Sequence, residues 1–229
     1  NNVWEFFDYI PDDHGLAWAF PKLGAVSIGI LGKSPKMRDF EMFLKNPIIK
    51  KKIDNREMLA FEGRKVWAAP IPDHLISKPY CDRIMVIGDA CGTADPILYE
   101  GIYQARLSGK LAASVFGRAL EEGDFGERVL SHYHNLLLDQ LYEEELRYTY
   151  KIHHLLFHSG LLGKIINASY KIAQDDKEMM HSLIAMFSGS QTRKYIWGVM
   201  MSRKWKLMKQ LGLRNSLSLL PAFVRSLSI

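Results

Sequence analysis

The sequence predicts an α/β protein, in the form of an α+β fragment whose C-terminal part is helical. Three observations predict this class. Up to residue 72, short runs rich in aromatic and β-branched residues are separated by turn residues. A single strand–loop–helix unit follows between residues 84 and 113. Beyond residue 126, long helical stretches are interrupted by isolated Gly and Pro residues.

The N-terminal strands are predicted from apolar and aromatic runs that are bounded by turn signals. These runs cover residues 3–10, 16–20 and 25–31, and clusters containing Pro and Gly separate them. Consecutive strands with short turns predict an antiparallel meander, which can form the floor of a pocket. One more strand is predicted at residues 66–71, just before Pro72.

Two short helices are predicted between these strands. Ser34 and Pro35 offer a hydroxyl cap and a favourable first residue for a helix that runs to about residue 45. A second helix passes through the lysines at 50–52, which we interpret as a solvated face. The C-terminal helices are predicted at residues 127–160, 161–187 and 191–211.

The stretch from residue 84 to residue 113 holds the clearest functional pattern. The unbroken apolar run at 84–87 predicts a strand that is buried on both faces. A loop follows over residues 89–98, and from Glu100 the apolar residues take up helical spacing. A strand, a loop and a helix in this order often hold a cofactor beyond the carboxyl end of the strand.

The residue types in this loop suit a flavin. Asp89 can accept hydrogen bonds from ligand hydroxyls, and Gly88, Gly92 and Gly101 allow the backbone to approach a flat ring closely. The first amides of the helix have no partners inside the helix and lie at the positive end of its dipole, so they would stabilise a reduced, anionic ring. Pro96 stiffens the turn. The alternative is that strand-Gly-Asp is common punctuation and the loop is scaffold only.

Two longer blocks resemble motifs of one enzyme family. The segment Gly88-Asp89-Ala90-Cys91-Gly92, with Asp95-Pro96 and Glu100-Gly101-Ile102 after it, resembles the second FAD-binding motif of the geranylgeranyl reductase family. That family belongs to the flavoproteins that are built like para-hydroxybenzoate hydroxylase. The segment Leu16-Ala17-Trp18-Ala19-Phe20-Pro21-Lys22 resembles the family's aromatic-x-Trp-x-Phe-Pro signature. The resemblance covers residues 3–125 well and the helical remainder loosely.

The resemblance implies a function and a set of site residues. It implies an FAD-dependent oxidoreductase that reduces carbon–carbon double bonds of a prenyl (geranylgeranyl) chain on a lipid or isoprenoid precursor. The implied FAD-binding residues are Gly88, Asp89, Ala90, Pro96, Glu100, Gly101 and Ile102. The implied substrate-binding residues are Trp18, Phe20 and Pro21. No catalytic proton donor and no metal ligand is predicted. Flavoprotein monooxygenases, halogenases and quinone-linked dehydrogenases share this loop and remain alternatives.

The sequence departs from the family pattern at three positions within the motifs. Cys91 stands where the family usually has Ala, and Tyr99 stands where it usually has Gly. Leu16 replaces the usual Tyr of the signature. Tyr99 adds bulk beside the expected ring, and Leu16 removes a hydroxyl that could orient a substrate. We interpret Cys91 as a small apolar substitute, although a redox role is conceivable.

A larger departure concerns the dinucleotide-binding motif. No Gly-x-Gly-x-x-Gly follows a strand in these 229 residues, which predicts that the N-terminal dinucleotide-binding segment is missing and that this fragment alone is inactive. The predicted division is therefore into three parts. Residues 1–72 would belong to a sheet-rich substrate-binding domain, residues 73–122 to the C-terminal segment of a Rossmann-like FAD-binding domain, and residues 123–229 to a helical C-terminal cap.

Charge and composition predict the compartment and a further partner. The chain has two cysteines and lacks an apolar run of the ~20 residues that span a bilayer, so we expect a cytoplasmic protein. The net charge is +5, but residues 179–229 contain eight Lys or Arg and no acidic residue. This asymmetry predicts an anionic membrane surface as partner of basic residues 193–225, and hence a peripheral membrane protein. No nucleic-acid partner is predicted, because no recognisable module accompanies the charge.

Two alternatives remain for this basic region. A packed C-terminal helix with a solvated basic face would explain the same charges. Alternatively, the whole chain would be a non-catalytic membrane-surface interaction module with a vestigial flavin loop.

Overall fold

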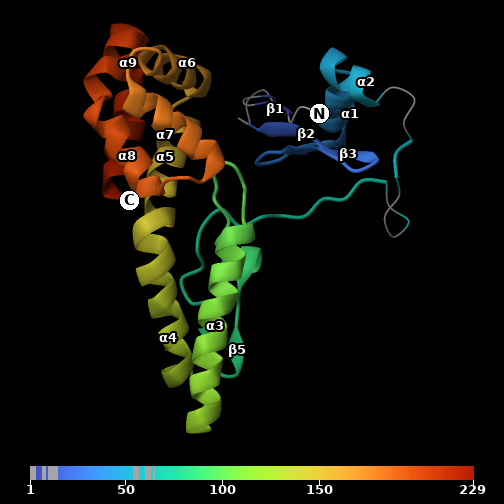
Figure 1. Cartoon of the computed structure of the whole chain (residues 1–229), viewed down its shortest axis with the longest axis vertical. Coiled ribbons are helices and arrows are strands. Elements are labelled where there is room, and N and C mark those ends of the chain that lie inside the picture. Colours follow the sequence, from blue (N-terminus) through green and yellow to red (C-terminus); the bar gives the residue numbers. More distant parts are fainter. Residues whose placement is uncertain (1–3, 7–8, 10–14, 54–56, 60–62, 64) are drawn as a thin grey trace. The chain divides into compact units, whose positions relative to one another are not determined.

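The computed structural model describes residues 4–6, 9, 15–53, 57–59, 63 and 65–229 (Figure 1). The chain divides into two compact units, Asn1–Ala69 and Pro70–Ile229. The first contains an antiparallel sheet with two helices, and the second is mainly helical. The predicted α+β class with a helical C-terminal part is therefore confirmed. No helix among the described residues is both long and apolar enough to cross a membrane.

The sheet of the first unit has the predicted antiparallel order. Strand β1 (Trp4–Phe6) pairs with β2 (Leu16–Lys22), which pairs with β3 (Ala25–Leu31). In this register Ala19 of β2 lies opposite both Trp4 and Ile28. Of the strand predicted at residues 3–10, positions 4–6 are confirmed, and residues 3, 7, 8 and 10 lie outside the described residues.

Two helices cover one face of this sheet. Helix α1 (Met37–Leu44) and helix α2 (Pro47–Ile53) supply Phe43 and Ile49, which are fully buried together with Ala17 and Ala19 of β2. The prediction that Ser34 and Pro35 begin the first helix is wrong. The helix begins at Met37, because the Asp39 carboxylate accepts a hydrogen bond of 2.8 Å from the Lys36 amide and so caps the chain there.

Two of the predicted strands are corrected by the structure. Residues 66–71 form an irregular exposed segment, because no described strand lies beside them to accept their hydrogen bonds. The apolar run at 84–87 yields only β5 (Ile84–Met85), which pairs antiparallel with β4 (Tyr80–Cys81). Ile84 and Ile87 are 55% and 46% exposed, because β4 is the one neighbour of β5 among the described residues.

The core of the second unit begins with two long helices that lie side by side. A 3₁₀ turn, η1 (Gly88–Cys91), and a loop precede helix α3 (Ile102–Glu122). Helix α4 (Glu127–Leu137) packs against α3 (Figure 1). Helix α4 continues without a break into the π-helical segment η2 (Leu138–Leu146) and then α5 (Arg147–Phe157).

Four further helices complete the second unit. They are α6 (Leu162–Ala173), α7 (Lys177–Ser188), α8 (Arg193–Ser202) and α9 (Lys204–Ser228). Helices α8 and α9 both contact α5, and α6 contacts both α7 and α9. Helix α9 is broken at Gly212, whose φ of 77° and ψ of 163° are not helical. The last helix was predicted to end near residue 211, but it resumes after the break and reaches Ser228.

Candidate functional site

The loop after β5 is joined to α3 by a short hydrogen-bond relay. The Gly88 amide donates to the Ser108 hydroxyl over 2.9 Å, and that hydroxyl donates to the Ala105 carbonyl over 2.8 Å. Ser108 is fully buried, so the relay is shielded from water. It fixes the start of the 3₁₀ turn against the first turns of α3.

The structure brings Asp89 and Gly101 together. A Cβ atom at Gly101 would overlap with the Asp89 carboxylate, so only glycine allows this approach. Gly101 is the N-cap of α3, and no side chain caps it among the described residues. The helix therefore presents its first amides beside a carboxylate, which combines hydrogen-bond donors and an acceptor at one place.

The other predicted FAD-binding residues differ in their accessibility. Ala90, Glu100 and Ile102 are exposed, as is Asp89, and we call these four residues the rim of the loop. Ile102 is 90% exposed. Pro96 is instead buried within the loop. The rim, and not the Pro96 ring, is the part of this loop that is accessible to a ligand.

The floor of the loop is formed by the segment that precedes β4. Gly92 has a left-handed φ of 72°, and a Cβ atom there would overlap with the His74 carbonyl. The neighbouring Ile76 amide donates to the Cys91 carbonyl over 3.1 Å. The Leu75 amide donates to the Tyr150 hydroxyl over 2.8 Å, which ties this floor to α5.

Cys91 lies beneath the rim as a buried thiol. Burial raises the pKa of Cys91 to about 11, so the thiol is protonated near neutral pH. A protonated, fully buried thiol is a poor nucleophile and packs as a small apolar group. The structure therefore favours the interpretation of Cys91 as a substitute for alanine.

A buried ion pair that the sequence did not reveal joins this loop to the helical region. The Arg193 guanidinium donates through Nε to Oδ2 of Asp95 over 2.7 Å, and its Nη2 lies 2.6 Å from the same oxygen. Oδ1 of Asp95 accepts the Ile97 amide over 2.7 Å. Both charged side chains are almost completely buried, at 9% and 4% exposure.

A second carboxylate completes this network. Oε2 of Glu145 accepts the Arg193 amide over 3.0 Å, and burial raises the pKa of the Glu145 carboxyl. Arg193 also donates to the Met186 carbonyl over 2.9 Å. One signal could have revealed the pair: Arg193 follows the capping residue Thr192, and an arginine in the first turn of a helix is unfavourable unless a carboxylate approaches it.

One further polar group in the loop is unusual. The Thr93 hydroxyl is buried and has no hydrogen-bond partner within the described part of the chain. Buried polar groups without partners are rare in folded proteins, and they are found at binding or strained sites. Sequence reasoning did not single out Thr93.

The first unit contains an apolar cavity of about 870 Å³. Its lining includes residues from both faces of the edge strand β3, from α1 and from the 57–68 segment. Trp18, Ile28, Phe40, Met58 and Trp67 are among these residues. The cavity therefore wraps around the outer edge of the sheet and offers a mainly hydrocarbon surface.

The predicted substrate-binding residues lie at or next to this cavity. Trp18 lines it, and Phe20 stacks on Trp18 with ring centroids 6.1 Å apart and planes at 27°. This confirms that the two aromatic residues share one strand face. The Trp18 indole lies directly over Gly29 on the neighbouring strand, where a Cβ atom would overlap with it. Pro21 lines a neighbouring hollow at the β2–β3 turn.

The basic C-terminal region carries less unpaired positive charge than its sequence indicated. Four of its eight basic residues are ion-paired with carboxylates of earlier elements. These pairs are Arg193–Asp95, Lys194–Glu144, Arg203–Asp176 and Lys206–Asp176. Among the described residues, no group of three or more His, Cys, Asp or Glu side chains could hold a metal ion.

Comparison with known proteins relates the chain to one group of enzymes. No protein-family model matches it. It is 33% identical over 155 residues to the digeranylgeranylglycerophospholipid reductase of Methanococcus aeolicus. The aligned region covers 64% of this chain and 38% of that protein. The enzyme of the same name from Methanospirillum hungatei is 27% identical over 222 residues, covering 91% of this chain and 49% of that protein.

These matches show which class of enzymes the chain is similar to. The relatives are reductases, so the chain is related to oxidoreductases. More particularly, both are digeranylgeranylglycerophospholipid reductases, which agrees with the resemblance of the two motifs to the geranylgeranyl reductase family, and the match falls mostly on the C-terminal part of the relatives. The chain spans between about a third and a half of the length of these curated relatives.

Proposed function

We propose that this protein is a portion of an FAD-dependent reductase that saturates carbon–carbon double bonds of a prenyl chain on a lipid precursor. The observation that carries the proposal is the contact between the Asp89 carboxylate and Gly101 at the start of α3. The relatives of this chain are named for the reduction of a lipid that carries geranylgeranyl chains. An apolar cavity in the same chain offers a surface for such a substrate.

The loop residues fit the chemical groups of FAD. Asp89 would accept hydrogen bonds from the hydroxyls of the polyol chain, and the exposed rim of Ala90, Glu100 and Ile102 would flank the cofactor. The first amides of α3 would stabilise negative charge that develops on the ring system. FAD in its reduced form would supply hydride to one carbon of the double bond, and a proton would go to the other carbon. The chain would position the cofactor and keep water away from it.

The cavity of the first unit would hold the prenyl chain. Its volume of about 870 Å³ lies within the range of small-molecule pockets, and apolar side chains line most of it. Trp18 and Phe20 would pack against the branched hydrocarbon. A mainly apolar lining suits a hydrocarbon substrate that carries isolated double bonds.

A dinucleotide-binding segment is part of this proposal. Exposed apolar residues of β5 and α3, such as Ile84 and Phe116, together with Ile87 just before η1, form a surface that such a segment would cover. The chain alone would then lack activity. We also propose peripheral association with a membrane, where a prenyl-lipid precursor would be found.

The test uses the chain joined to the upstream segment that carries the dinucleotide motif. Bound FAD would give an absorption band at about 450 nm. Asp89→Ala should weaken FAD binding, whereas Asp139→Ala, which removes an exposed carboxylate from η2, should leave it unchanged. With reduced FAD and a geranylgeranyl lipid, the product should gain two hydrogen atoms per double bond by mass spectrometry. A protein that takes up no FAD would refute the proposal.

A further inference from the structure

Helix α9 has two contrasting faces after its break at Gly212. One face is buried, and α9 as a whole packs against α5 and α6. The buried residues of this segment are Ser216, Leu219, Ala222 and Ser226. A second face exposes five large aliphatic side chains. They are Leu213 (80% exposed), Leu217 (57%), Leu220 (39%), Val224 (63%) and Leu227 (53%).

These five residues form a continuous stripe along the helix. They are spaced by four, three, four and three positions, which places them on one side of an α-helix. At about 100° per residue they span roughly 80° of the helix circumference. Leucine and valine side chains that are scattered singly on a surface need no explanation, but a contiguous stripe marks an interaction surface.

The charges beside the stripe indicate the chemistry of its partner. Arg214 and Arg225 are exposed, and both lie on the same flank of the stripe, because they are eleven positions apart in an α-helix. The sequence has no acidic residue from position 179 onward. An aliphatic stripe with a basic flank and no carboxylate in its own helix is the pattern of a helix that lies in the interface of an anionic bilayer.

A second copy of the chain fits the same surface less well. Two stripes that pack on each other in antiparallel fashion would bring Arg214 of one copy toward Arg225 of the other. Neither α9 helix has a carboxylate to neutralise these arginines. Like charges across an interface oppose association, whereas anionic lipid headgroups would neutralise them.

We propose that the stripe of α9, residues 213–227, inserts its aliphatic side chains into the headgroup region of an anionic membrane. Arg214 and Arg225 would contact the lipid phosphates. The inference refines the proposed membrane association and rests on the proposed function only in its choice of a lipid surface. It moves the contact away from Arg193, Lys194, Arg203 and Lys206, which are ion-paired.

The experiment is co-sedimentation of the full chain with phosphatidylcholine vesicles, with and without phosphatidylglycerol. We expect sedimentation with the anionic vesicles and much less with phosphatidylcholine alone. Leu217→Ser together with Val224→Ser should lower the partition coefficient at least tenfold, at about 0.8 kcal/mol per CH₂ group withdrawn from the lipid. Arg214→Gln together with Arg225→Gln should lower it roughly tenfold or more on anionic vesicles only.

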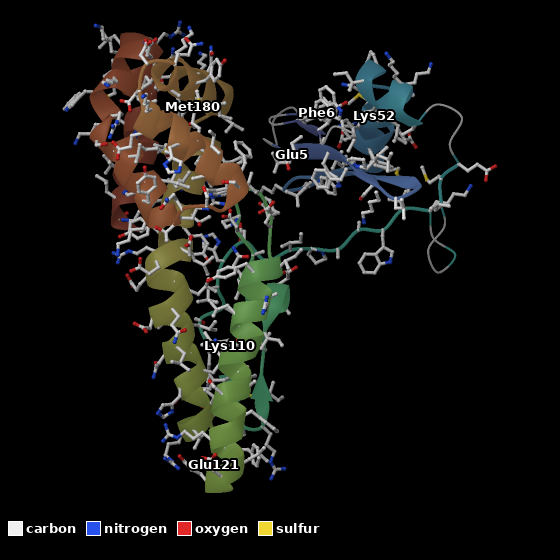
Figure 2. The ribbon with its side chains drawn as sticks, in the orientation of Figure 1. Glu5, Phe6, Lys52, Lys110, Glu121 and Met180 are labelled. Atoms are coloured by element: carbon white, nitrogen blue, oxygen red, sulfur yellow. The ribbon has the colours of Figure 1, made fainter. Side chains whose placement is uncertain are left out.

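Matched controls come from α3. Leu120→Ser removes an equally exposed leucine, and Lys110→Gln removes an exposed charge that projects from the middle of that helix (Figure 2). Circular dichroism should show that every variant keeps its helices. The inference is overturned if the stripe variants sediment like the wild type, if the controls lose as much binding, or if anionic lipid has no effect.

Two other outcomes separate this inference from its alternatives. If the wild type dimerises without vesicles and Leu217→Ser abolishes the dimer, then the stripe joins two copies and the membrane contact is refuted. If the chain binds anionic vesicles through the stripe, while the protein extended upstream takes up no FAD, then the membrane contact stands and the reductase proposal fails.

Discussion

The buried Asp95–Arg193 pair gives the sharpest prediction about stability. Arg193→Met keeps much of the side-chain volume but leaves the Asp95 carboxylate buried without its cation. Breaking a buried pair in this way costs about 3–5 kcal/mol, because the remaining charge cannot regain its hydration. Oδ1 of Asp95 would keep the Ile97 and Leu98 amides as donors, at 2.7 Å and 3.3 Å, whereas Oδ2 would lose both of its contacts with Arg193. We therefore expect a loss near the middle of that range.

The assay is urea unfolding followed by the helical circular dichroism signal, which reports mainly on the second unit because most helices lie there. Arg118→Met is the matched control. Arg118 pairs with Glu122 on the surface of α3, and an exposed pair of this spacing contributes little to stability, because water and salt screen it. If Arg193→Met costs no more than Arg118→Met, the pair does not stabilise the fold as argued. The double variant Arg193→Met/Asp95→Leu should recover part of the loss, because it removes the stranded charge as well.

Three further predictions concern other sites. Gly29→Ala should displace the Trp18 indole and weaken prenyl-lipid binding without changing FAD binding, and unchanged lipid affinity would refute the proposed pocket. Gly24→Ala is unsuitable as a control, because the φ of 72° at Gly24 would strain an alanine there. Gly92→Ala should destabilise the second unit by about 1–3 kcal/mol in urea unfolding, through its left-handed φ and its overlap with the His74 carbonyl; a neutral effect would contradict the contact. Burial lowers the pKa of His153 to about 4, so its contribution to stability is complete above its unfolded pKa of about 6.5 and is lost as the pH falls toward 4. His153→Gln should remove up to roughly 3 kcal/mol of the stability loss that occurs between about pH 6.5 and about pH 4. If the free energy of unfolding depends on pH in the same way in the variant, His153 is not the group responsible.

The elements that were predicted correctly depend on local sequence. Strand β2 alternates Trp18 and Phe20 with buried alanines, and the turn that joins it to β3 carries Gly24, so residues close together in sequence determine the pairing of the two strands. The helical character of the C-terminal part follows from its periodic apolar residues. The stretch predicted at 161–187 is, however, two helices, α6 and α7, because the Asp176 side chain accepts the Met179 amide and caps a new helix there. The approach of Asp89 to Gly101 is also local, because the loop between them is short.

The elements that were missed depend on partners that are distant in sequence. The run at 84–87 has the composition of a buried strand, but a strand needs neighbours, and β4 is the one that the described residues provide. The segment 66–71 has suitable residues and no described strand beside it. Arg193 was counted as part of a basic surface, yet it pairs with a carboxylate that lies 98 positions earlier. No local pattern specifies such a pairing.

The continuous helix from α4 through η2 to α5 holds the chain that precedes the loop at two points. Tyr133 of α4 donates to the Val86 carbonyl over 2.9 Å, and Tyr150 of α5 accepts from the Leu75 amide over 2.8 Å. The π-helical segment lies between these two tyrosines and sets their relative rotation. A π segment accommodates extra residues within a helix, so deletion of one residue there would turn the second tyrosine by about 100° around the axis. The segment beneath Gly92 would then lose the hydrogen bond from the Leu75 amide to Tyr150 of α5, although neither the loop nor its glycines had been altered.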